Sequence, residues 1–158
     1  MAIQADFFGP NVLFSSVLPS ARTGFSPGGS PITVFATVIN AGLSAAKNCS
    51  ISITGSEPVL LSYQLTDATN APTGPANAPF DIDHGNARSF ILSFSPIITD
   101  PGSDVFPRFI CDSGKVSAIA GVNTAFLSIF RKPGLIFYLS ARFHQMMEFY
   151  GLARAAAA

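Results

Sequence analysis

Ile32-Thr-Val-Phe-Ala-Thr-Val-Ile39 is the stretch that decides the fold of this chain. Nearly every residue in it is β-branched or aromatic, a composition typical of strands. A turn follows at Asn40-Ala-Gly-Leu43, because asparagine and glycine tolerate the positive φ angles of tight turns. Next, Cys49-Ser-Ile-Ser-Ile53 alternates with a period of two, so its cysteine and isoleucines share one face. These two strands and their turn indicate a β-sheet protein.

Five further segments have the composition of strands and are bounded by turn residues: 11–18, 59–65, 89–95, 105–111 and 122–129. Pro107 predicts a bulge or an edge in the segment 105–111. Residues 19–31 read as a loop, and Asp100 to Asp104 as a turn. Seven strands without a helical period predict an all-β fold, an immunoglobulin-like antiparallel β-sandwich, over residues 1–130.

The central strand makes a specific prediction about the two faces of its sheet. Val34, Ala36 and Val38 fall on one face, and Phe35 and Ile39 on the other. We expect one set to be buried and the other to be partly covered. The phenylalanines on strands read as core residues rather than a binding stripe, namely those at positions 35, 90, 94, 106, 109 and 126.

Charge and hydropathy exclude several classes of protein. Nine basic and nine acidic residues cancel, so the chain offers no basic field for a nucleic acid. Only 11% of the residues are charged, against roughly 25% in typical soluble domains, a mix common in exported β-rich modules. No stretch of the chain reaches 18 apolar residues, so the sequence predicts no transmembrane helix. No signal peptide is visible at the start of this chain.

Residues 131–158 differ in character from the rest of the chain. The Pro-Gly step in Arg131-Lys-Pro-Gly134 predicts an interruption of regular secondary structure. After it, apolar residues recur with a helical period, at 135, 139, 143, 146, 147 and 150. Three interpretations stay open: a helix packed on the sandwich, a helix on a membrane surface, and a product of a frame slip or assembly artefact. We expect this tail to be helical or irregular and dispensable for folding of the sandwich.

The segment from Thr33 to Ile53 resembles the signature of bacterial CARDB and DUF11 repeat modules: a strand, an Asn-x-Gly step, a small-residue stretch and a second alternating strand. Ser89-Phe-Ile-Leu-Ser-Phe-Ser-Pro96, Phe109-Ile-Cys111 and Gly121-Val-Asn-Thr-Ala-Phe-Leu-Ser128 are similar to the closing strands of such repeats. The resemblance covers about residues 11–129. It implies an immunoglobulin-like sandwich in tandem arrays on exported proteins, with a spacing or adhesive role and no catalytic residues.

The two cysteines are the strongest candidate for a functional pair. With the seven strands lettered A to G, Cys49 begins strand C and Cys111 ends strand F. Strands C and F are antiparallel neighbours in an immunoglobulin-like sandwich, so a disulfide between Cys49 and Cys111 is geometrically sensible, with Cα atoms within about 7 Å. The alternative is two buried free thiols in a reducing compartment. Two cysteines without a paired histidine have the wrong count for a metal site.

Other polar residues favour no catalytic or metal site. His84 lies in a polar turn, where we expect it to be solvated, and no Gly-x-Ser-x-Gly motif is present. Asp81 and Asp83 share a face of a short extended segment, and Asp100 and Asp104 flank a Pro-Gly turn. Loop carboxylates of this kind can bind calcium, but no Asp-x-Asp-x-Asp-Gly loop is present, so solvated strand ends are the favoured interpretation. We expect no catalytic residue, no metal and no cofactor.

These observations predict a non-catalytic structural or spacer module of an extracytoplasmic bacterial protein, one unit of a repeat array. Its partners would be neighbouring domains of the parent chain. The alternative is an adhesin-type module that binds carbohydrate or protein through loops 66–79 and 96–104. Those loops hold Asn, Thr, Pro and Ala but no aromatic residue, so the spacer interpretation is favoured.

Overall fold

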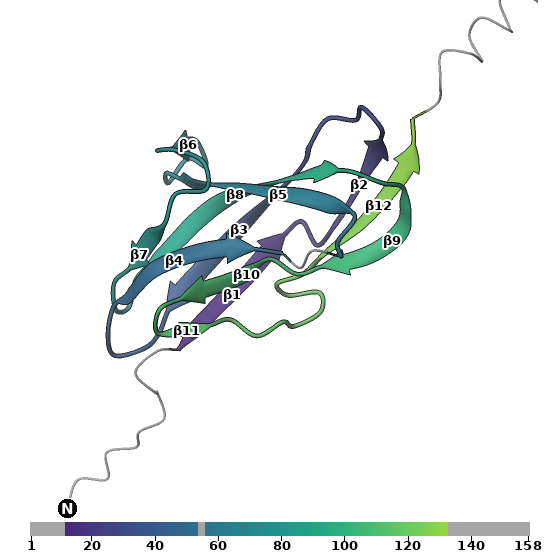
Figure 1. The fold of residues 1–158 in the computed structure, drawn as a ribbon. Coiled ribbons are helices and arrows are strands. Elements are labelled where there is room, and N and C mark those ends of the chain that lie inside the picture. Colours follow the sequence, from purple (N-terminus) through teal and green to yellow (C-terminus); the bar gives the residue numbers. More distant parts are fainter. Residues whose placement is uncertain (1–11, 54–55, 133–158) are drawn as a thin grey trace, which may run out of the picture.

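The computed structural model describes residues 12–53 and 56–132 of the chain, and this part is built from strands alone (Figure 1). The described residues include no helix that is long and apolar enough to cross a membrane. The strands are β1 (Leu13–Leu18), β2 (Ala21–Ser26), β3 (Ile32–Asn40), β4 (Ala46–Ser52), β5 (Val59–Thr66), β6 (Pro72–Thr73), β7 (Phe80–Ile82), β8 (Ala87–Pro96), β9 (Asp100–Val105), β10 (Arg108–Cys111), β11 (Gly114–Lys115) and β12 (Ala125–Arg131).

The strands form a β-sandwich of two layers. One layer is a sheet in the order β1-β3-β8-β5-β6. The other contains the sheet β11-β10-β4-β7 and the sheet β2-β12-β9. The segment 105–111, predicted as one strand with a bulge or an edge at Pro107, is instead divided: β9 ends at Val105 and β10 begins at Arg108, with Phe106 and the buried Pro107 between them. The layers correspond to the ABED and CFG sheets of an immunoglobulin-like sandwich, with β9 and β10 together as strand F.

Several strands, β2, β6 and β9 among them, lie where the sequence predicted irregular structure. β2 occupies part of the predicted loop 19–31, and β9 replaces the predicted turn after Asp100. β2 pairs with β12 in parallel, whereas the other strand pairs of the sandwich are antiparallel, as predicted. Gly24 lets β2 lie close to β3, because a Cβ atom there would come within 2.5 Å of the Ile32 side chain. Long-range pairing has overridden a weak local strand preference.

β3 is an interior strand of the first layer and is paired on both sides, with β1 and with β8. Val34, Ala36 and Val38 are buried, whereas Phe35 and Ile39 are 38% and 45% exposed on the opposite face. The predicted division of this strand into an inner and an outer face is therefore confirmed. It follows from the period-two geometry of a strand with one face against the core.

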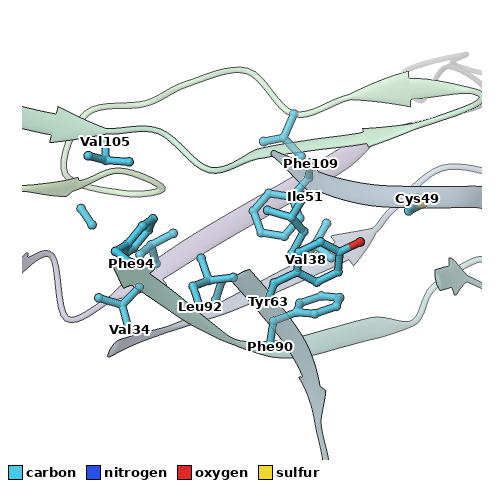
Figure 2. Packing of buried hydrophobic residues seen from close by; sticks show 14 of the residues in the cluster. Val34, Val38, Cys49, Ile51, Tyr63, Phe90, Leu92, Phe94, Val105 and Phe109 are labelled. Carbon is cyan, nitrogen blue, oxygen red and sulfur yellow. The ribbon is translucent and has the colours of Figure 1, made fainter. Parts of the chain in front are cut away.

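The core lies between the two layers and is rich in phenylalanine. Figure 2 shows Val34, Val38, Phe90, Leu92 and Phe94 from the first layer facing Ile51 and Phe109 from the second. Phe90, Phe94 and Phe109 are buried as predicted. Phe35 and Phe126 are exposed and Phe106 is only partly buried, so assigning all six phenylalanines to the core was wrong for these three.

Two buried asparagines, Asn40 and Asn123, hold the loops to this framework. Asn40 ends β3, and its side chain bonds to Gly42 and Ser44 in the β3–β4 turn and to Ile82 at the end of β7. The Asn123 amide donates to the carbonyl of Ser117 at 2.9 Å, and its oxygen accepts the backbone N–H of Ile119 at 2.7 Å. Both asparagines belong to short motifs, Asn40-Ala-Gly42 and Gly121-Val-Asn-Thr124, that the sequence analysis singled out.

The last described strand ends at Arg131, one residue beyond the predicted end of the sandwich at residue 130. The predicted tail, residues 131–158, lies outside the described residues from position 133 onward. Its helical or irregular character and its dispensability for folding stay predictions.

Candidate functional site

A disulfide joins Cys49 to Cys111, with an S–S distance of 2.02 Å and Cα atoms 4.0 Å apart. The predicted pairing and Cα distance are confirmed. Cys49 lies in the middle of β4 rather than at the start of a strand, because β4 begins at Ala46. Phe109 pairs with Ile51 and Ile110 with Ser50, so the next step of this register sets Cys111 opposite Cys49.

This disulfide lies within one layer, unlike the bridge of antibody domains, which joins the two layers. It ties β10 to β4 and closes a separation of 62 residues along the chain. By the chain-entropy model, a loop of that length corresponds to about 4 kcal/mol of stabilisation. Both cysteines are buried. The pair therefore acts as a structural cross-link.

An exposed polar cluster surrounds Asp81 on β7. Lys47 forms an ion pair with the Asp81 carboxylate at 2.9 Å, and the backbone N–H of Asn48 donates to the same carboxylate at 2.9 Å. The bond from Lys47 lowers the pKa of Asp81, and the bond to Asp81 raises the pKa of Lys47. About half of each side chain is exposed, so this pair contributes little to stability.

The carboxylates considered for calcium do not form a cation site. Asp81 in β7 and Asp83 just after it are both exposed, but the carboxylate of Asp81 is already paired with Lys47. Asp100 caps its own strand, since its carboxylate accepts the backbone N–H of Gly102 at 2.6 Å. Within residues 12–53 and 56–132, no group of three or more His, Cys, Asp or Glu side chains is arranged to hold a metal.

His84 is exposed but not merely solvated. Its Nδ1 hydrogen-bonds the carbonyl oxygen of Gly42, in the turn that follows β3. The ring thus links the β7–β8 turn to the β3–β4 turn, a structural role that the sequence did not reveal.

Three hollows on the described surface are open and shallow. The hollow between β4 and β5 measures about 470 Å³ and is lined by residues that include Ile51, Leu61 and Tyr63. The Tyr63 hydroxyl donates to the carbonyl of Ala78 at 3.1 Å, and burial raises the pKa of this phenol. The other two hollows, of about 420 and 570 Å³, lie beside β10 and β7. None of these three is lined by a histidine or a cysteine.

The two loops proposed for ligand binding lie far apart. In the β5–β8 ladder Leu65 pairs with Phe90, and Val59 pairs with Pro96. Loop 66–79 therefore leaves one end of this ladder, whereas the segment 96–104 leaves the other. The first loop is tied down by Asp67, whose carboxylate accepts the backbone N–H groups of Thr69 and Ala71. The two loops do not meet to form one site.

The outer surface of the first layer is the most unusual surface of the described molecule. Its outward-facing residues on β1, β3, β8 and β5 are here called the uncharged face. Three rows cross β1, β3 and β8: Leu18, Phe35 and Ile91; Ser16, Thr37 and Ser89; Phe14, Ile39 and Ala87. β5 extends the face with Leu60, Ser62 and Gln64. Arg88 is the only charged residue in these four strands.

Arg88 does not belong to the uncharged face. It pairs with Val38, which points into the core, and its guanidinium turns aside to donate to the carbonyl of Asp81 at 3.2 Å. The sequence placed Phe35 and Ile39 on the same face of their strand, but it did not show which residues of β1 and β8 lie beside them. The lack of charge at alternate positions of four strands was the available signal.

Comparisons with known proteins assign no family. No family model matches the chain, and no curated protein matches it. Several solved structures are similar, three of them at 8–13% identity. AvmM, which catalyses macrocyclization in alchivemycin A biosynthesis, has a TM-score of 0.45 over 79% of this chain and 91% of its own. The Pseudomonas fluorescens alkylpurine DNA glycosylase AlkC, bound to DNA containing an abasic site analog, has a TM-score of 0.38 over 78% and 31%. The periplasmic chaperone SfaE has a TM-score of 0.31 over 76% and 59%. Likeness at this level carries no functional argument.

Proposed function

We propose that this chain is a non-catalytic structural or spacer module of an extracytoplasmic bacterial protein, one unit of a repeat array of the CARDB or DUF11 type. The observation that carries the proposal is the path of the chain. β1 begins at one end of the sandwich and β12 ends at the other (Figure 1). A module that the chain enters at one end and leaves at the other lengthens an array with each repeat.

The register of the strands explains this path. β1 begins opposite Asn40, the last residue of β3, and ends opposite Phe35. β2 continues onward to the second layer, where β12 runs parallel to it and ends with Arg131 opposite Ser26. The first and last strands of the module therefore run along its length in the same general direction, which separates its two ends.

The disulfide supports the extracytoplasmic part of the proposal. Disulfides persist in oxidising compartments and are rare where glutathione and thioredoxin keep thiols reduced. Cys49 and Cys111 are buried in β4 and β10, so the bridge is shielded as a structural cross-link should be. A cross-link between neighbouring strands suits a module that bears tension between its ends.

Sequencing the complete transcript that contains this reading frame tests the array. We expect further in-frame segments with the order of strands, Asn-x-Gly step and two cysteines found here. A single isolated copy would contradict the array.

Cell fractionation in the source organism, followed by alkylation of free thiols under denaturing conditions, tests the compartment. We expect the oxidised protein outside the cytoplasm. Recovery of the reduced protein from the cytoplasm would contradict the proposed location.

A further inference from the structure

The uncharged face combines exposed apolar side chains with hydroxyl groups. Phe14, Leu18 and Ile39 are 54%, 66% and 45% exposed, although they lie on paired strands of the sheet. The outer face of the second layer, by contrast, carries Asp104 and Arg108. The solvated face of an antiparallel sheet ordinarily carries polar and charged residues, and contiguous apolar exposure marks an interaction surface.

We propose that a second copy of this chain docks on the uncharged face and forms a two-fold symmetric dimer. This inference goes beyond the proposed function and does not depend on it. The order of the three rows points to a second copy as the partner. An apolar row lies on each side of a central hydroxyl row, so the pattern is symmetric about its centre. The central row holds Ser16, Thr37 and Ser89, and the hydroxyls of Thr37 and Ser89 lie 3.1 Å apart.

A two-fold axis along the central row makes this pattern complementary to itself. The rotation sets the row of Leu18, Phe35 and Ile91 in one copy against the row of Phe14, Ile39 and Ala87 in the other. Apolar side chains then meet apolar side chains. Hydroxyl groups meet hydroxyl groups, and each hydroxyl can both donate and accept a hydrogen bond. Isologous dimers are built in this way, with one patch used twice.

Charge and packing geometry favour the same occupant. A strongly charged partner would bury unpaired charges against this face, whereas a second copy buries none. The axis aligns the strands of the two copies, which is the common arrangement of packed sheets. In this arrangement Ile39 of one copy faces the partner's Phe35.

The size of the face limits the strength of the dimer. Four strands spaced about 4.8 Å apart, each contributing about seven residues at 3.3 Å, give a plane of roughly 450 Å². Side chains project from this plane, so its accessible area is larger than the plane itself. It approaches the area of about 800 Å² that each partner buries in a standard interface. We therefore expect a reversible dimer with an interface no larger than the standard size.

Sedimentation velocity of the full chain over a range of concentrations tests the dimer. We expect a monomer–dimer equilibrium that Ile39→Lys weakens at least tenfold. Ile110→Lys is the matched control, because Ile110 is 40% exposed on the other layer and receives the same substitution. A wild-type chain that stays monomeric at several hundred micromolar, or equal weakening by both variants, would overturn the proposal.

A complementary pair of variants tests the symmetry and does not depend on one substitution being tolerated. Phe35→Glu alone should also weaken the dimer. A mixture of Ile39→Lys and Phe35→Glu should associate more tightly than either variant alone, because the new lysine then faces the new glutamate. Circular dichroism checks that each variant is folded. If the mixture associates no better than its components, the proposed pairing is wrong.

Discussion

The side-chain amide of Asn40 donates a hydrogen bond to the backbone carbonyl of Ile82, 3.0 Å away and 42 residues further along the chain. The same amide donates to the carbonyl of Ser44 at 2.8 Å, and its oxygen accepts the N–H of Gly42 at 3.0 Å. Asn40 is fully buried. One side chain thus fixes the β3–β4 turn and attaches it to the end of β7.

Replacing Asn40 by alanine should destabilise the fold by roughly 2–4 kcal/mol, because buried backbone groups lose their partners and their desolvation is no longer offset. Urea unfolding of Asn40→Ala measures the loss. Asn86→Ala is the control, since Asn86 is exposed and its backbone bonds survive the substitution. If the two variants lose similar amounts, Asn40 is not the anchor described here.

Reduction of the Cys49–Cys111 disulfide should lower the free energy of unfolding by about 4 kcal/mol, because the reduced unfolded chain regains the entropy of the closed loop. Chemical unfolding with and without a reducing agent measures the difference. The double variant Cys49→Ser, Cys111→Ser should match the reduced protein and should not respond to the reducing agent. A stability that is independent of the redox state would contradict this prediction.

The pKa of Asp81 should lie below the ordinary range of an aspartate, and Lys47→Met should raise it toward that range, since the bond from Lys47 is the largest cause of the shift. A folded-state pKa below the unfolded one gives stability at neutral pH that is lost as the pH falls through the folded pKa. Carboxyl-carbon NMR titration of both proteins tests the shift. Equal Asp81 pKa values would exclude Lys47 as the cause.

Gly24→Ala should destabilise the sandwich by roughly 1–3 kcal/mol, because the added Cβ would come within 2.5 Å of the buried Ile32 side chain. Ile32→Val removes the nearest of the clashing atoms, so the double variant should lose less than the sum of the two single losses. A double-mutant cycle by thermal unfolding measures this coupling. Strict additivity would show that the close contact between β2 and β3 does not limit this position.

The sequence by itself determined those features that depend on neighbouring residues. Ile32–Ile39 is a strand, and its inner and outer faces follow from a period of two that tertiary structure did not alter. Pro107 interrupts strand F because proline lacks the N–H that a central strand needs. The Cys49–Cys111 pairing was also accessible, since the order of strands alone places strands C and F side by side.

Only the tertiary structure decided features that depend on distant partners. Ala21-Arg-Thr-Gly-Phe-Ser26 has little strand preference, and its strand exists because β12, about a hundred residues later, supplies hydrogen-bond partners along its length. The uncharged face is of the same kind. Phe35, Leu18 and Ile91 are separated widely in the chain, and each alone is an ordinary exposed side chain. They become one surface because sheet register sets opposite residues about 5 Å apart, a distance that no local sequence pattern encodes.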